Sequence, residues 1–157
     1  MQQRDAKMYK KILVPVDGSA ASNRGLAEAL KLAQAVGAQV RIVHAVNELI
    51  MDSGYAAVTY HDDVIQSLRE TGRKTLEQAR DAAQAQGLKV ETELVETLGG
   101  RAADVIIDQV KQWSADLIVM GTHGRRGVRR LVMGSDAELV LRMSPVPVLL
   151  VRESEEK

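Results

Sequence analysis

The residues of this chain best suited to chemistry lie between positions 116 and 135, where an apolar run gives way to glycines and arginines. The run at 117–120 is followed by Gly121, and further glycines stand at 124, 127 and 134. Glycine lets a backbone approach a ligand closely, and the free N–H groups at the start of a helix attract negative charge. A strand that ends in glycines and leads to a helix at Ser135 therefore predicts an anion site, with a plain structural turn as the alternative.

Arginines cluster in this stretch, but the charge of the whole chain is balanced. The chain as a whole has 21 basic and 21 acidic residues and a formal net charge of zero, which gives no overall field to attract nucleic acid or a membrane. One tryptophan, three tyrosines and no phenylalanine leave few platforms for stacking bases. We therefore expect no nucleic-acid and no membrane partner. The nucleic-acid alternative would depend on the arginine cluster and predicts steep salt dependence: Arg125, Arg126, Arg129 and Arg130.

The composition argues against several other kinds of site. The chain contains no cysteine, which excludes disulfides, thiolate metal sites and cysteine nucleophiles. His44, His61 and His123 lack the spacing of a zinc site. The polar N-terminal stretch has no apolar core of a secretory signal, and no apolar run approaches the ~18 residues that a membrane span needs. A cytoplasmic location is the expectation.

Apolar patterning predicts that strands and helices alternate strictly. Helical spacing predicts helices from about residue 22 to a stop at Gly37 and over 64–86, 102–113 and 135–143, with Trp113 anchoring the third in the core. Residues 47–63 show no clear period and predict a long loop. The pattern indicates one doubly wound α/β domain over residues 1–157, with its core at 10–152 and a charged tail at 153–157. Short apolar runs predict its five strands at 12–16, 40–46, 90–95, 117–120 and 146–151, the third near an edge.

Two strand ends carry conspicuous chemistry. Asp17, Gly18 and Ser19 follow the first strand, and Gly121 follows the fourth. In open α/β sheets, ligands bind beyond the carboxyl ends of the strands, where the strand order reverses. If the first and fourth strands are neighbours, the two ends meet in one crevice.

Common nucleotide and hydrolase motifs are missing. The chain has no P-loop, and its glycines do not form the dinucleotide pattern G-x-G-x-x-G. The third strand ends at Val95 and Glu96 without the aspartate of a phospho-acceptor domain, and no G-x-S-x-G elbow occurs. Only Asp17 or His123 could act as a general base, so enzymatic activity stays open and would at most be a slow hydrolysis.

The glycine pattern and its flanks resemble one family. Gly121-x2-Gly124-x9-Gly134-Ser135 is similar to the nucleotide-binding pattern of the universal stress protein family. The segments KILVPVDGS at 11–19, ADLIVMGTHG at 115–124 and SPVPVLLV at 144–151 resemble that family's first, fourth and last strands. The resemblance covers about residues 10–152 and points to the members that bind ATP, so the enzymatic alternative would be slow ATP hydrolysis.

The resemblance implies a Rossmann-like fold, with parallel strands in the order 3-2-1-4-5 and with ATP or another adenine nucleotide at the switch point, with or without Mg²⁺. It also implies a regulatory role in stress response and a homodimer formed through the last strand, at 147–151. By resemblance, Asp17 lies toward the ribose or a metal carried by the nucleotide, and Ala45 offers backbone groups to the adenine. The implied nucleotide-binding residues are Pro15, Val16, Asp17, Ala45, Gly121, His123, Gly124, Arg125, Gly134, Ser135 and Asp136.

Several residues have simpler interpretations that stay open. Ser135 can serve as a helix N-cap, because Ser135 and Glu138 form a capping-box pattern. Asp17 can be a turn residue, and His44 a hydrogen-bonded core histidine. Asp136 departs from the family pattern, and its carboxylate competes with phosphate for the same positive helix end. Asp136 favours the main alternative function, a scaffold of the same fold that binds no nucleotide and acts through dimerisation and protein partners.

Overall fold

The computed structural model describes residues 8–47, 57–123 and 133–153, with the side chains of the second range described from residue 62 onward. Strands and helices alternate along it, as the patterning predicts. Their bounds are β1 (Lys11–Pro15), α1 (Ala20–Val36), β2 (Gln39–Asn47), α2 (Ala57–Ala85), β3 (Val90–Thr97), α3 (Ala102–Trp113), β4 (Leu117–Gly121), α4 (Ser135–Met143) and β5 (Val148–Val151).

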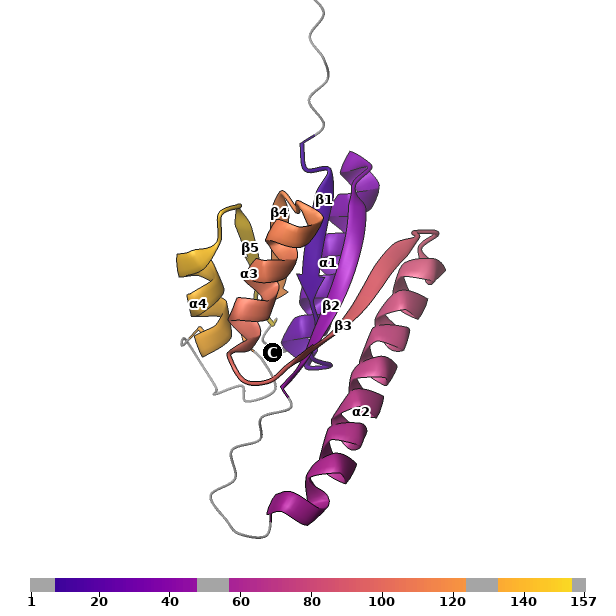
Figure 1. Ribbon diagram of the computed structural model, residues 1–157. Coiled ribbons are helices and arrows are strands. Elements are labelled where there is room, and N and C mark those ends of the chain that lie inside the picture. The colour runs from indigo at the N-terminus through magenta and orange to yellow at the C-terminus, as the bar shows by residue number, and fades with distance from the viewer. Residues whose placement is uncertain (1–7, 48–56, 124–132, 154–157) are drawn as a thin grey trace, which may run out of the picture.

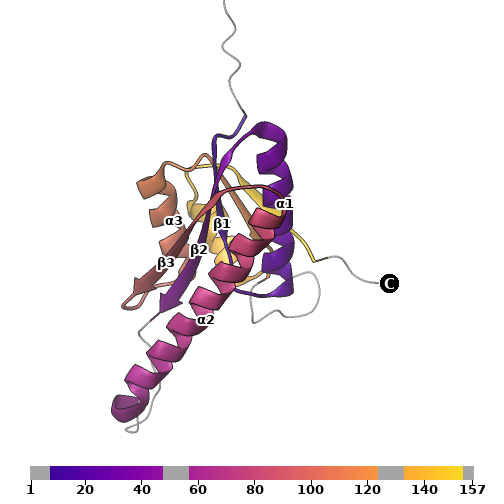
Figure 2. The ribbon, with the colours of Figure 1, turned by 90° about the vertical axis from the view of Figure 1, so that its right-hand side faces the viewer.

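The five strands form one parallel sheet in the order β3-β2-β1-β4-β5, which confirms the Rossmann-like order and puts β3 at an edge (Figure 1). Helices α1 and α2 cover one face of the sheet, and α3 and α4 cover the other (Figure 2). The chain thus reverses its direction of winding between β1 and β4, which lie side by side. The carboxyl ends of β1 and β4, which the predicted site residues follow, therefore lie next to each other.

The central strand shows why a continuous apolar run is needed. Ile12 and Val14 pack into a core with α1 and α2, whereas Leu13 packs into a second core with α3 and α4. All three are fully buried. Since successive side chains of a strand point to opposite faces, a strand covered on both faces must be apolar at every position.

Trp113 is the last residue of α3 and lies near the amino ends of the strands, opposite the predicted site. It is only 7% exposed, as expected for a core anchor. The Lys11 Nζ lies 5.2 Å and the Arg41 guanidinium 4.8 Å from its ring centroid. The Lys11 Nζ also donates to the Trp113 carbonyl at 3.1 Å. These contacts tie β1, β2 and α3 together where the strands begin.

Two helix starts differ from the predictions. Helix α1 begins at Ala20 rather than near residue 22, because Ser19 is its N-cap and its hydroxyl accepts from the Ser22 N–H. Helix α2 begins at Ala57, so the prediction of a loop over 47–63 is wrong from residue 57 onward; residues 48–56 are outside the described ranges. The first turns of α2 extend past the sheet (Figure 2). Turns that extend past the core need no apolar period, so the residue pattern shows no helical signal there.

The last strand is shorter than predicted. Pro147 has no N–H for the ladder, although its carbonyl accepts from the Ile118 N–H at 3.0 Å. The Ser144 hydroxyl donates to the Val146 carbonyl at 2.7 Å and accepts from the Val146 N–H at 3.2 Å. Residue 146 is therefore engaged in a turn, and the strand begins at Val148.

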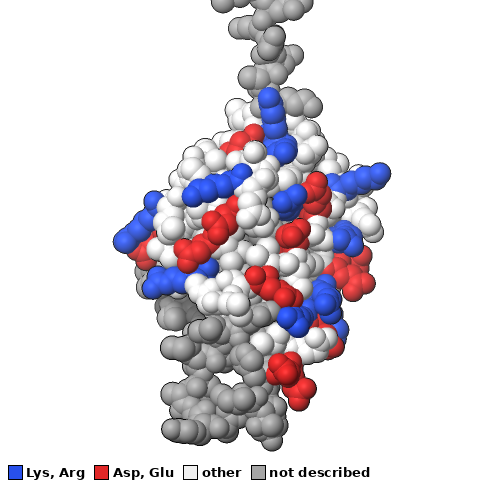
Figure 3. Space-filling model, viewed as in Figure 1, with Lys and Arg blue, Asp and Glu red and all other residues white. Residues whose placement is uncertain are grey.

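The surface agrees with a balanced net charge. Basic and acidic side chains are interspersed over the face that Figure 3 shows, where the described residues form no large patch of one sign. None of the helices in the described ranges is long and apolar enough to cross a membrane.

Candidate functional site

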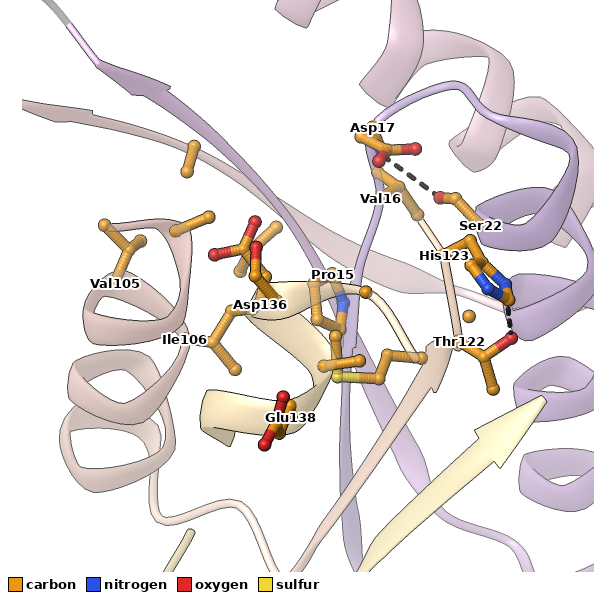
Figure 4. Close-up of a pocket in the computed structure, with 18 of the residues that line it drawn as sticks. Pro15, Val16, Asp17, Ser22, Val105, Ile106, Thr122, His123, Asp136 and Glu138 are labelled. Atoms are coloured by element: carbon orange, nitrogen blue, oxygen red, sulfur yellow. Dashed lines mark hydrogen bonds between the residues drawn. The ribbon is translucent and has the colours of Figure 1, made fainter. Parts of the chain in front are cut away.

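A cavity of about 690 Å³ opens at the carboxyl ends of β1, β2 and β4, against the first turns of α3 and α4. This size is typical of small-molecule sites. In Figure 4, Val105 and Ile106 lie on one side of the cavity, and Asp17, Thr122 and His123 lie on the other. The cavity therefore has an apolar wall facing a polar one.

The end of β1 supplies Pro15, Val16 and Asp17. The Asp17 Oδ1 accepts from the Ser19 N–H at 2.8 Å, and the Asp17 N–H donates to the Ser22 hydroxyl at 3.0 Å (Figure 4). These bonds fold the chain tightly into α1. Asp17 is thus a turn residue and a lining residue of the cavity at once, and the two interpretations are compatible.

The end of β2 supplies His44 and Ala45. The His44 Nδ1 lies 2.8 Å from the Val16 carbonyl oxygen, so Nδ1–H donates to it and β2 is tied to the end of β1. The ring packs under α2: a Cβ built on Gly72 would lie only 2.7 Å from the His44 Cδ2. His44 is therefore a hydrogen-bonded histidine, as expected. It also borders the cavity, which its place in an apolar strand did not indicate.

The end of β4 supplies Gly121, Thr122 and His123, and Gly121 has a packing role that the sequence did not indicate. A Cβ on Gly121 would lie 2.6 Å from the carbonyl carbon and oxygen of Ala21. The absence of a side chain there lets α1 pack on the strand end. Gly121 also lines the cavity, so its close approach to a ligand stays a prediction beside this packing reason.

Thr122 connects three parts of the site. Its N–H donates to the Val151 carbonyl at 3.1 Å, and its carbonyl accepts from the Gly134 N–H at 2.7 Å. Its Oγ1 lies 3.0 Å from the Nδ1 of His123 (Figure 4). Thr122 is missing from the predicted residues, because a threonine after a strand has no distinctive signal in a single sequence.

Helix α4 begins at Ser135, as predicted, but its N-cap is Gly134 and no side chain caps it. The capping interpretation of Ser135 and Glu138 is therefore wrong. The physical reason is tertiary: the bond from Gly134 to Thr122 places residue 134 at the cap, and the Glu138 N–H donates to the Gly134 carbonyl at 3.0 Å. Ser135 is instead the first helical residue and lines the cavity.

Two carboxylates of the first turn of α4 border the cavity. Asp136 was predicted, and Glu138 was not; Glu138 also pairs with Arg142 at 2.8 Å. Both are favourable for the positive end of α4. Among the described residues that line the cavity there is no lysine or arginine, so these carboxylates and Asp17 make its described lining acidic.

The apolar wall was also missed. Helix α3 starts at the mouth of the cavity and presents small and branched apolar side chains to it, together with residues of β4 and α4. Which residues of α3 face the cavity depends on how α3 and α4 pack, and helical period alone does not reveal this. The wall consists of Ala102, Val105, Ile106, Met120, Met133 and Ala137.

The structure brings together all the predicted site residues that it describes. Gly124 and Arg125 lie outside the described ranges, as do Arg126, Arg129 and Arg130. No group of three histidine, cysteine, aspartate or glutamate side chains suited to a metal ion occurs in the described part of the chain. The predicted site residues that line this cavity are Pro15, Val16, Asp17, Ala45, Gly121, His123, Gly134, Ser135 and Asp136.

Fold and cavity together define a doubly wound α/β domain with its ligand cleft at the point where the strand order reverses. The universal stress protein family model matches residues 8–152, and the chain belongs to that family. It is 34% identical over 146 residues to universal stress protein MJ0531 of Methanocaldococcus jannaschii, covering 93% of this chain and 84% of that one.

Solved structures agree. Universal stress protein UspA from Lactobacillus plantarum superposes with a TM-score of 0.81 at 25% identity, covering 92% of this chain and 98% of that one. A universal stress protein in complex with cAMP has a TM-score of 0.69 at 29% identity, covering 93% and 99%. One from Archaeoglobus fulgidus in complex with dAMP has a TM-score of 0.63 at 25% identity, covering 91% and 98%.

Proposed function

We propose that this protein binds an adenine nucleotide, ATP in the first instance, in the cavity between the ends of β1, β2 and β4, and that occupancy of the cavity has a regulatory role in stress response. The observation that carries the proposal is the cavity itself, in which an apolar wall faces a polar edge and a helix N-terminus. The related proteins bound to cAMP and dAMP support an adenine nucleotide as the ligand class.

Each part of a nucleotide has a matching part of the cavity. A planar base fits against the apolar side chains of α3, where Val105 and Ile106 exclude water. Backbone groups at Ala45 serve the base edge, and the Asp17 carboxylate serves the ribose hydroxyls. The start of α4 and the His123 ring serve the phosphate, since N–H groups at a helix start favour anions.

Two carboxylates at the cavity are suited to a metal ion that accompanies the nucleotide. Asp17 and Asp136 offer oxygen atoms, the ligands that Mg²⁺ takes. The described residues provide no three-residue metal cluster, so the Mg²⁺ in this proposal is held largely by the phosphates of the nucleotide. Such an ion would offset repulsion between Asp136 and a polyphosphate.

The first experiment is to denature freshly purified protein and identify any small molecule that it releases. Titration calorimetry of the emptied protein with ATP, AMP, cAMP and adenosine then ranks the ligands. Ala102→Phe should abolish binding by filling the base side of the cavity, and Ala82→Phe, on the exposed face of α2, is the matched control. The proposal fails if nothing is released and no ligand binds.

We also propose a homodimer formed through β5. This strand ends the sheet, and Leu149 on it is 42% exposed. Leu141 and Met143 at the end of α4 are exposed as well. An open edge with apolar side chains is a template for pairing with a second strand. Light scattering over a concentration series should show dimers for the natural chain and monomers for Leu149→Lys; monomers for both would refute the dimer.

A further inference from the structure

The backbone N–H and the backbone carbonyl of Thr122 are both hydrogen-bonded. Val151 at the end of β5 accepts from its N–H at 3.1 Å, and the cap residue of α4, Gly134, donates to its carbonyl at 2.7 Å. The side chain is 9% exposed, and a β-branched side chain has few rotamers to choose from. The backbone position of Thr122 is therefore set by β5 and the start of α4, and burial restricts the directions that its hydroxyl can take.

That hydroxyl meets the next residue. The Thr122 Oγ1 lies 3.0 Å from the Nδ1 of His123, and His123 lines the nucleotide cavity (Figure 4). A contact between adjacent side chains is common, but this one links a rigidly held hydroxyl to a half-buried ring at the polar edge of the cavity. The contact restricts how the imidazole can rotate and gives its Nδ1 a polar partner.

We propose that Thr122 is a positioning residue for nucleotide phosphate: its hydroxyl holds His123 by Nδ1, so that Nε2 carries the proton that the ring donates to a phosphate oxygen. This inference rests on the proposed function, since it assigns a task within the same cavity. Thr122 itself does not contact the phosphate in this scheme.

The chemistry follows from the two ring nitrogens. A neutral imidazole has one N–H donor and one acceptor, so a hydroxyl that donates to Nδ1 puts the ring proton on Nε2. In the imidazolium, Nδ1–H donates to the hydroxyl oxygen, and Nε2 again carries a proton. In these two states Nε2–H is a donor, whereas the neutral Nδ1–H tautomer would donate to the hydroxyl and leave Nε2 an acceptor. A charged phosphate oxygen only accepts, so it favours the states in which Nε2 carries a proton, and this charge-assisted bond is stronger than one to a neutral acceptor.

The test compares ligands that differ only in phosphate. Affinities for adenosine, AMP and ATP are measured by titration calorimetry for the natural chain, Thr122→Val, Thr122→Ser, His123→Ala and the Thr122→Val/His123→Ala pair. Thr122→Val keeps the backbone bonds and loses the hydroxyl. We expect Thr122→Val to lower the affinity for AMP and ATP about three- to tenfold, which is the effect of losing one hydrogen bond. The affinity for adenosine should stay within about twofold of that of the natural chain. Thr122→Ser should retain the natural affinity.

The double variant and the ring spectrum complete the test. If Thr122 acts through His123, the double variant loses no more phosphate affinity than His123→Ala alone. The side-chain ¹⁵N resonances of His123, assigned by their loss in His123→Ala, should show protonated Nε2 in the AMP complex of the natural chain. In Thr122→Val the Nδ1–H tautomer should become populated.

The outcomes separate the two proposals. Unchanged AMP and ATP affinity in Thr122→Val, or an equal loss for adenosine, would overturn the positioning role while the nucleotide function stands. Additive losses in the double variant would also overturn it. If the natural chain binds neither adenosine nor nucleotides, the proposed function fails first, and the inference fails with it.

Discussion

Gly25 of α1 and Gly121 at the end of β4 are packed so closely that neither has room for a side chain. A Cβ on Gly25 would lie 2.9 Å from the Gly121 nitrogen, and a Cβ on Gly121 would lie 2.6 Å from the Ala21 carbonyl. The start of α1 is thereby seated on the end of β4. This contact brings Asp17, which precedes α1, to the same cavity as His123, which follows β4.

Gly121→Ala should destabilise the fold by about 2–3 kcal/mol, because the clash is with backbone atoms that cannot rotate away. Gly87→Ala is the informative control: a Cβ there meets nothing within 4 Å, but its φ of 74° costs a side chain about 1 kcal/mol. Urea unfolding followed by circular dichroism measures both. A Gly121→Ala chain no less stable than Gly87→Ala would contradict the packing argument.

Asp136→Asn should raise the affinity for ATP about three- to tenfold, because it removes a carboxylate from the first turn of α4, where phosphate is proposed to lie. Adenosine affinity should not change, and the gain should shrink in high salt. Calorimetry at two salt concentrations measures both effects.

Glu138→Gln is the matched control for Asp136→Asn, since it removes an equal charge from the same turn but one already paired with Arg142. It should change ATP affinity less than Asp136→Asn does. Equal gains from both substitutions would point to a general charge effect. No gain from Asp136→Asn would mean that its carboxylate does not face the phosphate.

Asn47 holds the turn that leads into α3. Its Nδ2 donates to the Gly100 carbonyl at 3.2 Å, and its Oδ1 accepts from the Gly99 N–H at 3.1 Å. Asn47→Asp keeps the acceptor but replaces the donor with an oxygen that faces a carbonyl. We expect a loss of about 1 kcal/mol in stability and weaker adenosine binding, because Ala102 of the apolar wall follows this turn.

Hydrogen exchange tests directly whether Asn47 holds this turn in place. The amide protons of Gly99, which donates to the Asn47 Oδ1, and of Arg101, which donates to the Asp104 Oδ2 in the same turn, should exchange faster in Asn47→Asp, while amides in the middle of β1 keep their protection. Asn47→Ser, which can supply only one bond, should fall between the two. Unchanged exchange around the turn in Asn47→Asp would show that the turn holds its own shape.

Trp113→Ala should cost about 3–5 kcal/mol, as expected for a large buried aromatic residue that also receives Lys11 and Arg41 over its ring. Circular dichroism is the suitable probe, since the chain has no other tryptophan. Trp113 lies at the opposite edge of the sheet from the cavity, so the folded variant should bind adenosine as the natural chain does. A selective loss of binding would show that the two edges are coupled.

The general plan of the fold was predictable, because it depends on local patterns. Buried parallel strands must be apolar throughout, and helices that cover them need one apolar face, so alternation of the two was visible in the sequence. That β1 and β4 are neighbours was indicated only by the family resemblance. The start of α2 was not predictable, because its first turns extend past the sheet.

The candidate site was also predictable only in part. Asp17 and Gly121 could be located because they follow apolar strands whose ends a parallel sheet can bring together, whereas Pro15 and Ala45 were indicated only by the family resemblance. The residues missed are those whose role depends on contacts between distant segments. Thr122 became important through bonds to β5 and α4, and Gly134 replaced Ser135 as N-cap through one of those bonds. Such contacts do not alter the local spacing of residue types.

The cavity has one more consequence, for the lifetime of the protein. Its walls extend along the chain from Pro15 to Glu138, so a chain that has folded only its first strands has no cavity at all. A ligand that binds only the complete fold shifts the unfolding equilibrium by RT ln(1 + [L]/Kd). A protease that cleaves transiently opened chains would then remove the empty protein sooner than the loaded one. On the proposed function, the nucleotide supply would set how long each molecule survives as well as how many are occupied.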